Sequence, residues 1–129
     1  PGGYAEFRMV PITGHPHDPR RAAQSTYMGY TIGRWEGDTL VLDSIGFSDE
    51  TWLGRGGWFH SDQMRVVEKF TRTGNQMLYE VTVEDPEVLV EPWVMPARTL
   101  RIANNNTIIA ERGSCSDSEL AEVSSQMRH

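Results

Sequence analysis

Cysteine is almost absent from this sequence of 129 residues, in which Cys115 stands alone. A single cysteine excludes an intrachain disulfide and a cysteine-rich zinc site. Long apolar runs are lacking too, since no stretch approaches the ~18 residues that a membrane-spanning helix needs. Positive charge is scarce, with 12 Lys and Arg against 18 Asp and Glu and a net charge of −6. We therefore expect neither a nucleic-acid partner nor an anionic membrane surface.

The remaining composition suits one globular domain. Hydrophobic residues make up 38% of the chain and charged residues 23%, which is not the composition of a disordered chain. We expect a single domain over residues 1–129, with residues 113–129 as a tail. The sequence begins Pro-Gly-Gly without methionine, so we also expect that an upstream segment was removed or left out. This leaves the compartment open between the bacterial periplasm and the cytoplasm.

Alternation of apolar and polar residues with a period of two dominates the chain and predicts β-strands. Seven strands are predicted, over residues 4–10, 27–35, 39–45, 63–72, 76–84, 98–103 and 107–112. Glycine and asparagine mark hairpin turns at 36–38, 74–75 and 104–106. Two short helices are predicted, one over 18–24 with Pro19 after an Asp cap and one over 116–125 with a capping box.

This pattern predicts an all-β fold. Antiparallel strands in meander order leave two exposed edges unless the sheet curls shut. A small closed barrel or a curled half-barrel solves this problem, and a two-sheet sandwich is the alternative. Because a small barrel has room for one small ligand, candidate functional residues are those that face its interior.

Two carboxylates are predicted to lie in that interior. Glu68 shares the more apolar face of its strand, where an ionised carboxylate is costly unless it is paired. Glu68 is therefore a candidate general acid or base, and a structural ion pair with Arg98 or Arg101 is the alternative. Asp43 lies on a strand that is apolar on both faces, so its carboxylate needs a hydrogen-bond donor. A turn cap is the alternative for Asp43.

Residues 46–62 form a long connection rich in glycine and tryptophan, and such connections tend to be lids or binding loops. His60 and Asp62 stand at its end, where a carboxylate can fix the tautomer of a histidine and raise its basicity. The alternative for His60 is a histidine of a surface loop. We predict His60, Asp62, Glu68 and Asp43 as catalytic residues.

Aromatic side chains are predicted to line the pocket. Trp52, Trp58 and Phe59 of the 46–62 loop offer apolar area to cover the barrel mouth. Tyr79 is predicted to point inward, with its hydroxyl toward a polar group. The predicted substrate-binding set is Tyr27, Trp35, Trp52, Trp58, Phe59, Phe70 and Tyr79.

Residues 15–18 read His-Pro-His-Asp, which resembles a small metal cluster that His60 could complete. The proline keeps the segment extended, which can place the two imidazoles on opposite sides of the chain. We therefore predict no metal site and no cofactor.

Residues 33–43 read Gly-Arg-Trp-Glu-Gly-Asp-Thr-Leu-Val-Leu-Asp. This run resembles the signature Gly-Arg-Trp-Glu-Gly-Asp-Thr-Leu-Val-Val-Asp of a widespread, largely uncharacterised bacterial family. Shorter matches extend the resemblance over about residues 26–112. It implies a small lipocalin-like barrel with a pocket, and no settled reaction.

The chain departs from the family pattern in the 46–62 loop and just after it. Residues 57–62 read Gly-Trp-Phe-His-Ser-Asp where the family pattern has Gly-His-Pro-His-Ser-Asp. Trp58 thus replaces one histidine, and Arg65 replaces another. The loss of histidines argues against a metal and favours an apolar substrate and proton transfer.

We therefore predict a cofactor-independent enzyme of lyase or isomerase type. Its substrate would be a small apolar molecule such as a terpenoid, a steroid or an aromatic compound. The reaction would be the opening of an epoxide, an isomerisation, an elimination or a hydration, by general acid–base catalysis in the pocket. The alternatives are a carrier for a small hydrophobic ligand and an interaction domain whose interior is filled. A homodimer is expected if the barrel lacks a segment of its own.

Overall fold

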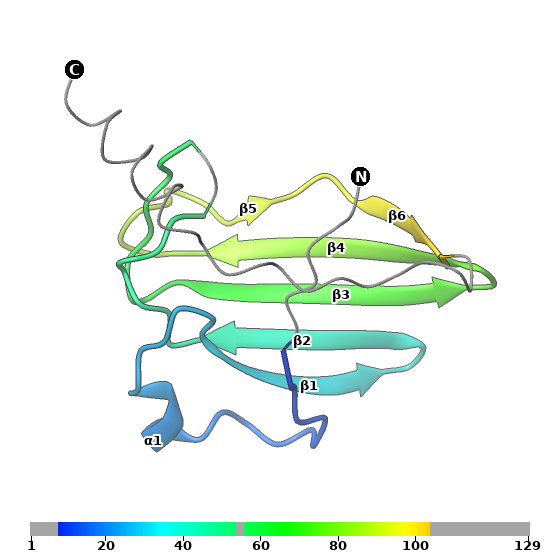
Figure 1. The fold of residues 1–129 in the computed structure, drawn as a ribbon, viewed down its shortest axis with the longest axis horizontal. Helices are drawn as coiled ribbons and strands as arrows, with labels where there is room; N and C mark the ends of the chain where they lie inside the picture. Colours follow the sequence, from blue (N-terminus) through cyan, green and yellow to red (C-terminus); the bar gives the residue numbers. More distant parts are fainter. Residues whose placement is uncertain (1–7, 54–55, 104–129) are drawn as a thin grey trace, which may run out of the picture. The chain divides into compact units, whose positions relative to one another are not determined.

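An antiparallel sheet dominates the computed structural model, which describes residues 8–53 and 56–103. Met9–Ile102 form one compact unit. Its elements are α1 (Pro19–Ala22), β1 (Tyr30–Glu36), β2 (Thr39–Ile45), β3 (Arg65–Thr73), β4 (Gln76–Glu84), β5 (Trp93–Val94) and β6 (Arg98–Arg101). Neighbouring strands follow the order β1-β2-β3-β4-β5, with β6 also paired to β4 (Figure 1). The all-β prediction is confirmed.

Local sequence signals explain most of the boundaries. β2 and β4 have the bounds that the alternation predicts, and Gly37 and Gly74 lie in the turns that precede them. β3 begins two residues later than predicted, because the Met64 N–H donates to the Ser61 carbonyl in a turn. The predicted helix over 18–24 is confirmed in a shorter form, Pro19–Ala22. It begins where predicted, because the Asp18 side chain caps it by accepting from the Arg20 N–H.

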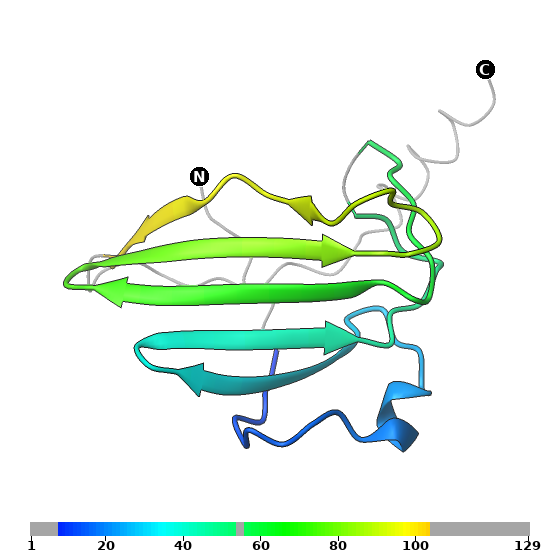
Figure 2. The same cartoon turned by 180° about the vertical axis from the view of Figure 1, so that it is seen from behind.

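β5 and β6 lie one after the other along the same edge of β4, as both views show (Figures 1 and 2). Between them, the Met95 N–H still donates to the Val81 carbonyl at 3.0 Å. Pro96 has no N–H to continue the ladder, so the edge strand is broken there. No strand is predicted between residues 84 and 98, so the sequence analysis missed β5.

The predicted closed barrel is wrong for this sheet, which is open. β1 forms one edge, and β5 and β6 form the other (Figure 1). The segment before α1 covers part of the β1 edge, since the Gly33 N–H donates to the Pro11 carbonyl at 2.9 Å. Among the described strands, none joins the two edges. The predicted strand 107–112, turn 104–106 and helix 116–125 lie outside the described residues, as does most of the strand 4–10.

Each face of the sheet carries its own buried residues. Met64, Val81 and Val83 form a core cluster on the face that also carries Glu68. The opposite face carries Val41 and Asp43, both buried. β2 is thus buried on both faces, as its sequence predicts. Within the part of the chain that the structure describes, no helix has the length and apolar character needed to cross a membrane.

Candidate functional site

A buried carboxylate on β2 organises the candidate site. Asp43 is 5% exposed, and Arg65 donates two hydrogen bonds to its carboxylate. Arg65 Nε donates to Oδ1 at 2.9 Å, and Nη2 donates to Oδ2 at 2.6 Å. Such bidentate pairs are the strong and geometrically specific form of an ion pair. The predicted need of Asp43 for a donor is therefore confirmed.

His17 approaches the same carboxylate from the segment before α1. Its Nε2 lies 3.5 Å from Asp43 Oδ1, which is too long for a good hydrogen bond. The ring edge packs on Tyr30, with ring centroids 5.2 Å apart. Both ring nitrogens of His17 are buried without a hydrogen-bond partner among the described residues. A buried polar group left without a partner is uncommon and points to a role beyond packing.

Charge at this site favours an ionised Asp43. Burial raises the pKa of Asp43, but the hydrogen bonds and the charge of Arg65, to which the nearby His17 ring adds, outweigh burial, so this pKa lies below its usual value. Hydrogen bonding to Asp43 in turn raises the pKa of Arg65. Arg65 Nη1 also lies 3.4 Å from Glu84 Oε2. The carboxylate of Asp43 is therefore an anionic acceptor for an N–H on Nε2 of His17.

A cleft of about 360 Å³ adjoins this pair. The lining residues are Gly14, His15, Pro16, His17, Ile32, Gly33, Arg34 and Asp43. We call it the His17 cleft. Its outer wall is the segment over residues 14–16, held to β1 by a long bond of 3.4 Å from the Gly14 N–H to the Gly33 carbonyl. Because both ring nitrogens of His17 are buried, a ligand in the cleft would reach them only if this segment moved.

His60 has a different environment. It is 4% exposed, Nδ1 lies 2.8 Å from the Ser61 carbonyl, and Nε2 lies 2.7 Å from Thr51 Oγ1. Because a carbonyl only accepts, Nδ1 must carry a hydrogen, and the Thr51 hydroxyl that meets Nε2 also lies 3.0 Å from the Ser48 carbonyl. Asp62 is exposed and accepts from Gln63 instead of orienting His60. The contact of Nε2 thus links Thr51 to His60 across the 46–62 loop, while Nδ1 contacts only the next residue.

Glu68 lies on the opposite face of the sheet from Asp43. It is 7% exposed, and its Oε1 accepts from the Tyr79 hydroxyl at 2.7 Å. Tyr79 stacks on Phe70 with ring centroids 4.7 Å apart. The structure therefore brings three predicted site residues together and confirms that the Tyr79 hydroxyl meets a polar group.

The predicted aromatic lid does not cover a barrel mouth, because the sheet is open. Trp52 and Phe59 pair across a short bridge in the 46–62 loop and are 69% and 67% exposed. Trp58 packs edge-on against Trp93, with ring centroids 6.1 Å apart.

Two further predicted aromatic residues are also exposed. Trp35 lies at the end of β1 and is largely exposed. The exposed Tyr27 donates to Glu50, whose carboxylate raises the pKa of Tyr27. Trp35 and Tyr27 do not line the His17 cleft.

The suspected metal ligands are used in other ways. Asp18 caps α1, and His17 faces Asp43. Among the described residues, no group of three or more His, Cys, Asp or Glu side chains could hold a metal ion.

Sequence reasoning missed Asp85, which is buried and accepts from the Ser61 N–H and hydroxyl, each at 2.7 Å. Burial raises the pKa of Asp85, but the hydrogen bonds from Ser61, Glu87 and Val88 outweigh burial and lower it. An Asp-Pro pair directly after a strand is a turn signal that could have identified this residue.

Comparison of the chain with family models, curated proteins and solved structures found no match.

Proposed function

We propose that the chain is a cofactor-independent enzyme of lyase or isomerase type, which moves a proton on a small, largely apolar molecule in the His17 cleft. One observation carries this proposal: the two ring nitrogens of His17 have no hydrogen-bond partner beside an ionised carboxylate. The hydrogen bonds of a catalytic base are often long or poorly aligned until substrate binds. The 3.5 Å separation from Asp43 fits that description.

Each side chain has a defined task in this scheme. Arg65 fixes Asp43 with two bonds. Once substrate is bound, Asp43 would accept from Nε2 of His17 across the contact that is 3.5 Å in the structure, which would leave the lone pair of Nδ1 as the base. When Nδ1 takes a proton, the nearby carboxylate stabilises the imidazolium. A positioned acid–base group of this kind contributes about 10²–10⁴-fold to a rate.

The size of the cleft limits the substrate. At ~30 Å³ for each water-sized volume, 360 Å³ holds a molecule of roughly twelve non-hydrogen atoms. Pro16, Ile32 and Gly33 give the walls apolar character, and Arg34 adds a guanidinium whose Nη2 lies 2.7 Å from Glu36. We extend the proposal to the lipocalin-like fold that the family resemblance implies, with the sheet as the scaffold of the pocket.

The test uses 5-nitrobenzisoxazole, a small apolar probe with one acidic C–H bond. A base removes this proton, the C–H electron pair forms the nitrile, and the ring N–O bond breaks to give a coloured phenolate. We expect the full chain to accelerate this elimination and His17→Asn to lose about 10²-fold. His15→Asn is the matched control, because His15 lines the same cleft without approaching Asp43, and its rate should stay within about threefold.

Two results would count against the proposal. The first is an equal rate for His17→Asn and the unaltered chain, with far-ultraviolet circular dichroism showing that both are folded. The second is an equal loss in His15→Asn and His17→Asn. Either result would remove His17 as the base and favour the carrier alternative.

A further inference from the structure

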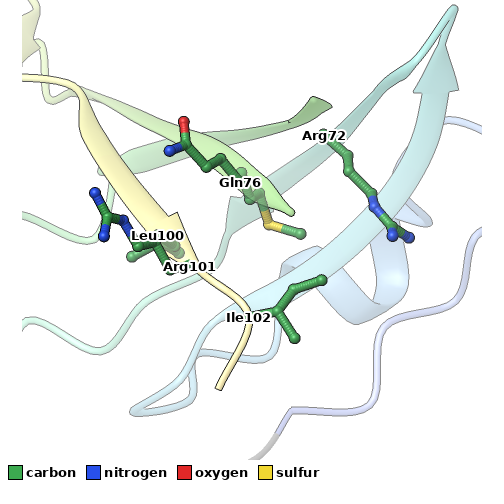
Figure 3. A pocket seen from close by; sticks show the side chains of 6 residues that line it. Arg72, Gln76, Leu100, Arg101 and Ile102 are labelled. Carbon is green, nitrogen blue, oxygen red and sulfur yellow. The ribbon is translucent and has the colours of Figure 1, made fainter. Parts of the chain in front are cut away.

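A second hollow lies at the far end of β3 from Arg65. It has a volume of about 330 Å³ and is lined by Arg72, Gln76, Met77, Leu100, Arg101 and Ile102. Figure 3 shows two of these lining residues, Arg72 on β3 and Ile102 just after β6. We call it the Arg72 pocket. Arg65 and Arg72 are separated along β3 by about 23 Å at ~3.3 Å per residue, so this pocket is separate from the His17 cleft.

The walls of the Arg72 pocket combine apolar area with one fixed cation. Arg72, Met77 and Leu100 stand opposite one another on β3, β4 and β6, so their side chains share a face of the sheet. Arg101 stands opposite Gln76, on the other face. Arg72 Nε donates to the Gly74 carbonyl at 3.0 Å, which restrains the guanidinium of a residue that lines the pocket with Met77 and Ile102.

The guanidinium of Arg72 has no carboxylate partner among the described residues. Arg34 and Arg65 form ion pairs with Glu36, Asp43 and Glu84. Arg72 forms none, although the chain carries 18 acidic residues against 12 basic ones. Within residues 8–53 and 56–103, no acidic side chain therefore competes with an external anion for its Nη1 and Nη2 groups.

We propose that the Arg72 pocket binds a small amphiphilic carboxylate. The carboxylate would accept from Nη1 and Nη2 of Arg72, and the apolar tail would lie against Met77, Leu100 and Ile102. Sites for small ligands are typically concave and mostly apolar, with a few polar groups that fix orientation. Arginine offers a planar fork that matches a carboxylate. This site does not depend on acid–base catalysis in the His17 cleft.

The volume sets the length of the probe. At ~30 Å³ for each water-sized volume, 330 Å³ holds roughly eleven heavy atoms. Octanoate, with about ten heavy atoms, fits this space. A ligand of this size should bind with a dissociation constant on the order of 1 mM.

The experiment titrates the full chain with sodium octanoate and follows the methyl resonance of Met77. We expect a saturable shift with octanoate and a much smaller one with octanamide, which has the same tail and no charge. Arg72→Gln should weaken octanoate binding about tenfold, because it removes a charged donor. Arg98→Gln is the matched control, because Arg98 on β6 is an exposed arginine like Arg72 on β3 but does not line the pocket. Its binding should stay within about twofold.

The apolar half of the proposal has its own pair of variants. Ile102→Asn should weaken octanoate binding, whereas Val94→Asn should not, because both side chains are similarly exposed and only Ile102 lines the pocket. Arg72→Lys keeps the charge without the Nε bond to Gly74 and should retain more affinity than Arg72→Gln.

Two outcomes would overturn the proposal. One is the absence of a saturable shift at roughly ten times the expected ~1 mM constant. The other is an equal loss in Arg72→Gln and Arg98→Gln, which would indicate general attraction of the anion instead of a site.

Discussion

The side chain of Asp85 joins the turn after β4 to Ser61, which lies just before β3. Its loss should destabilise the protein strongly. Its Oδ2 accepts from the Ser61 N–H, and its Oδ1 accepts from the Ser61 hydroxyl, both at 2.7 Å. Oδ1 also accepts from the Glu87 N–H at 3.1 Å. A hydrogen bond to a charged group is worth about 1.5–3 kcal/mol. Because the three bonds share one carboxylate and are not additive, Asp85→Ala should lower the free energy of unfolding by about 3–4 kcal/mol.

Urea unfolding of the full chain, followed by tryptophan fluorescence, measures this loss. Asp85→Asn keeps the shape but turns an amide NH₂ toward the donors of Ser61, so it should lose about 2 kcal/mol. Asp62→Ala is the control, because Asp62 is exposed and bonds only Gln63 among the described residues; it should change stability by less than about 0.5 kcal/mol. A loss under about 1 kcal/mol in Asp85→Ala, or a loss equal to that of Asp62→Ala, would refute this reasoning.

Two further predictions concern stability. Gly46 has a φ of +70°, and a Cβ there would lie 2.9 Å from the Ala22 carbonyl oxygen, so Gly46→Ala should lower the melting temperature more than Gly37→Ala. Gly37 has a φ of +60° but open space around it, so it isolates a backbone strain of about 1 kcal/mol; equal shifts in the two variants would contradict this account. The lowered pKa values of Asp43 and Asp85 predict stability that is complete above about pH 5 and falls as the pH drops below ~4, since the unfolded state then binds more protons. The urea midpoint measured against pH should show this fall, with a weaker slope in Asp85→Asn; an unchanged slope in that variant would count against the role of Asp85.

An element of the fold could be predicted when its own residues determine it, and could not when a distant part of the chain does. β2 and β4 alternate clearly and follow glycine turns, so their bounds were predicted from sequence alone. β5 has only two residues and lies between Pro92 and Pro96, so it shows no alternation of its own. It is a strand because it pairs with the edge of β4. The covering of the β1 edge could not be predicted either. The Pro11 carbonyl accepts from the Gly33 N–H, but Pro11 belongs to no predicted strand.

The two buried carboxylates, Glu68 and Asp43, find their hydrogen-bond partners by the same rule of sheet geometry. Glu68 stands opposite Val81, and its partner Tyr79 is two residues away on the same face. Asp43 stands opposite Val67, and its partner Arg65 is likewise two residues away. Diagonal neighbours of this kind lie within reach of long side chains.

These two pairs differ in how far the sequence could predict them. The tight turn at Gly74 sets the register of β3 and β4, so the pairing of Glu68 with Tyr79 could have been predicted from the turn. β2 and β3 are joined by the long connection over 46–64, which sets no register. The pairing of Asp43 with Arg65 therefore needed the structure.

The same distinction explains why the proposed base moves from His60 to His17. The ring nitrogens of His60 bond Ser61 and Thr51, which belong to its own loop. A histidine that is satisfied by its own loop stabilises that loop and has no lone pair left for a substrate. His17 instead meets a carboxylate from a strand that lies beyond α1 and β1 in the chain, and its nitrogens make no hydrogen bond among the described residues. Proton transfer in the described part of the chain should therefore fail with His17→Asn and survive His60→Asn once the loss of loop stability is corrected for.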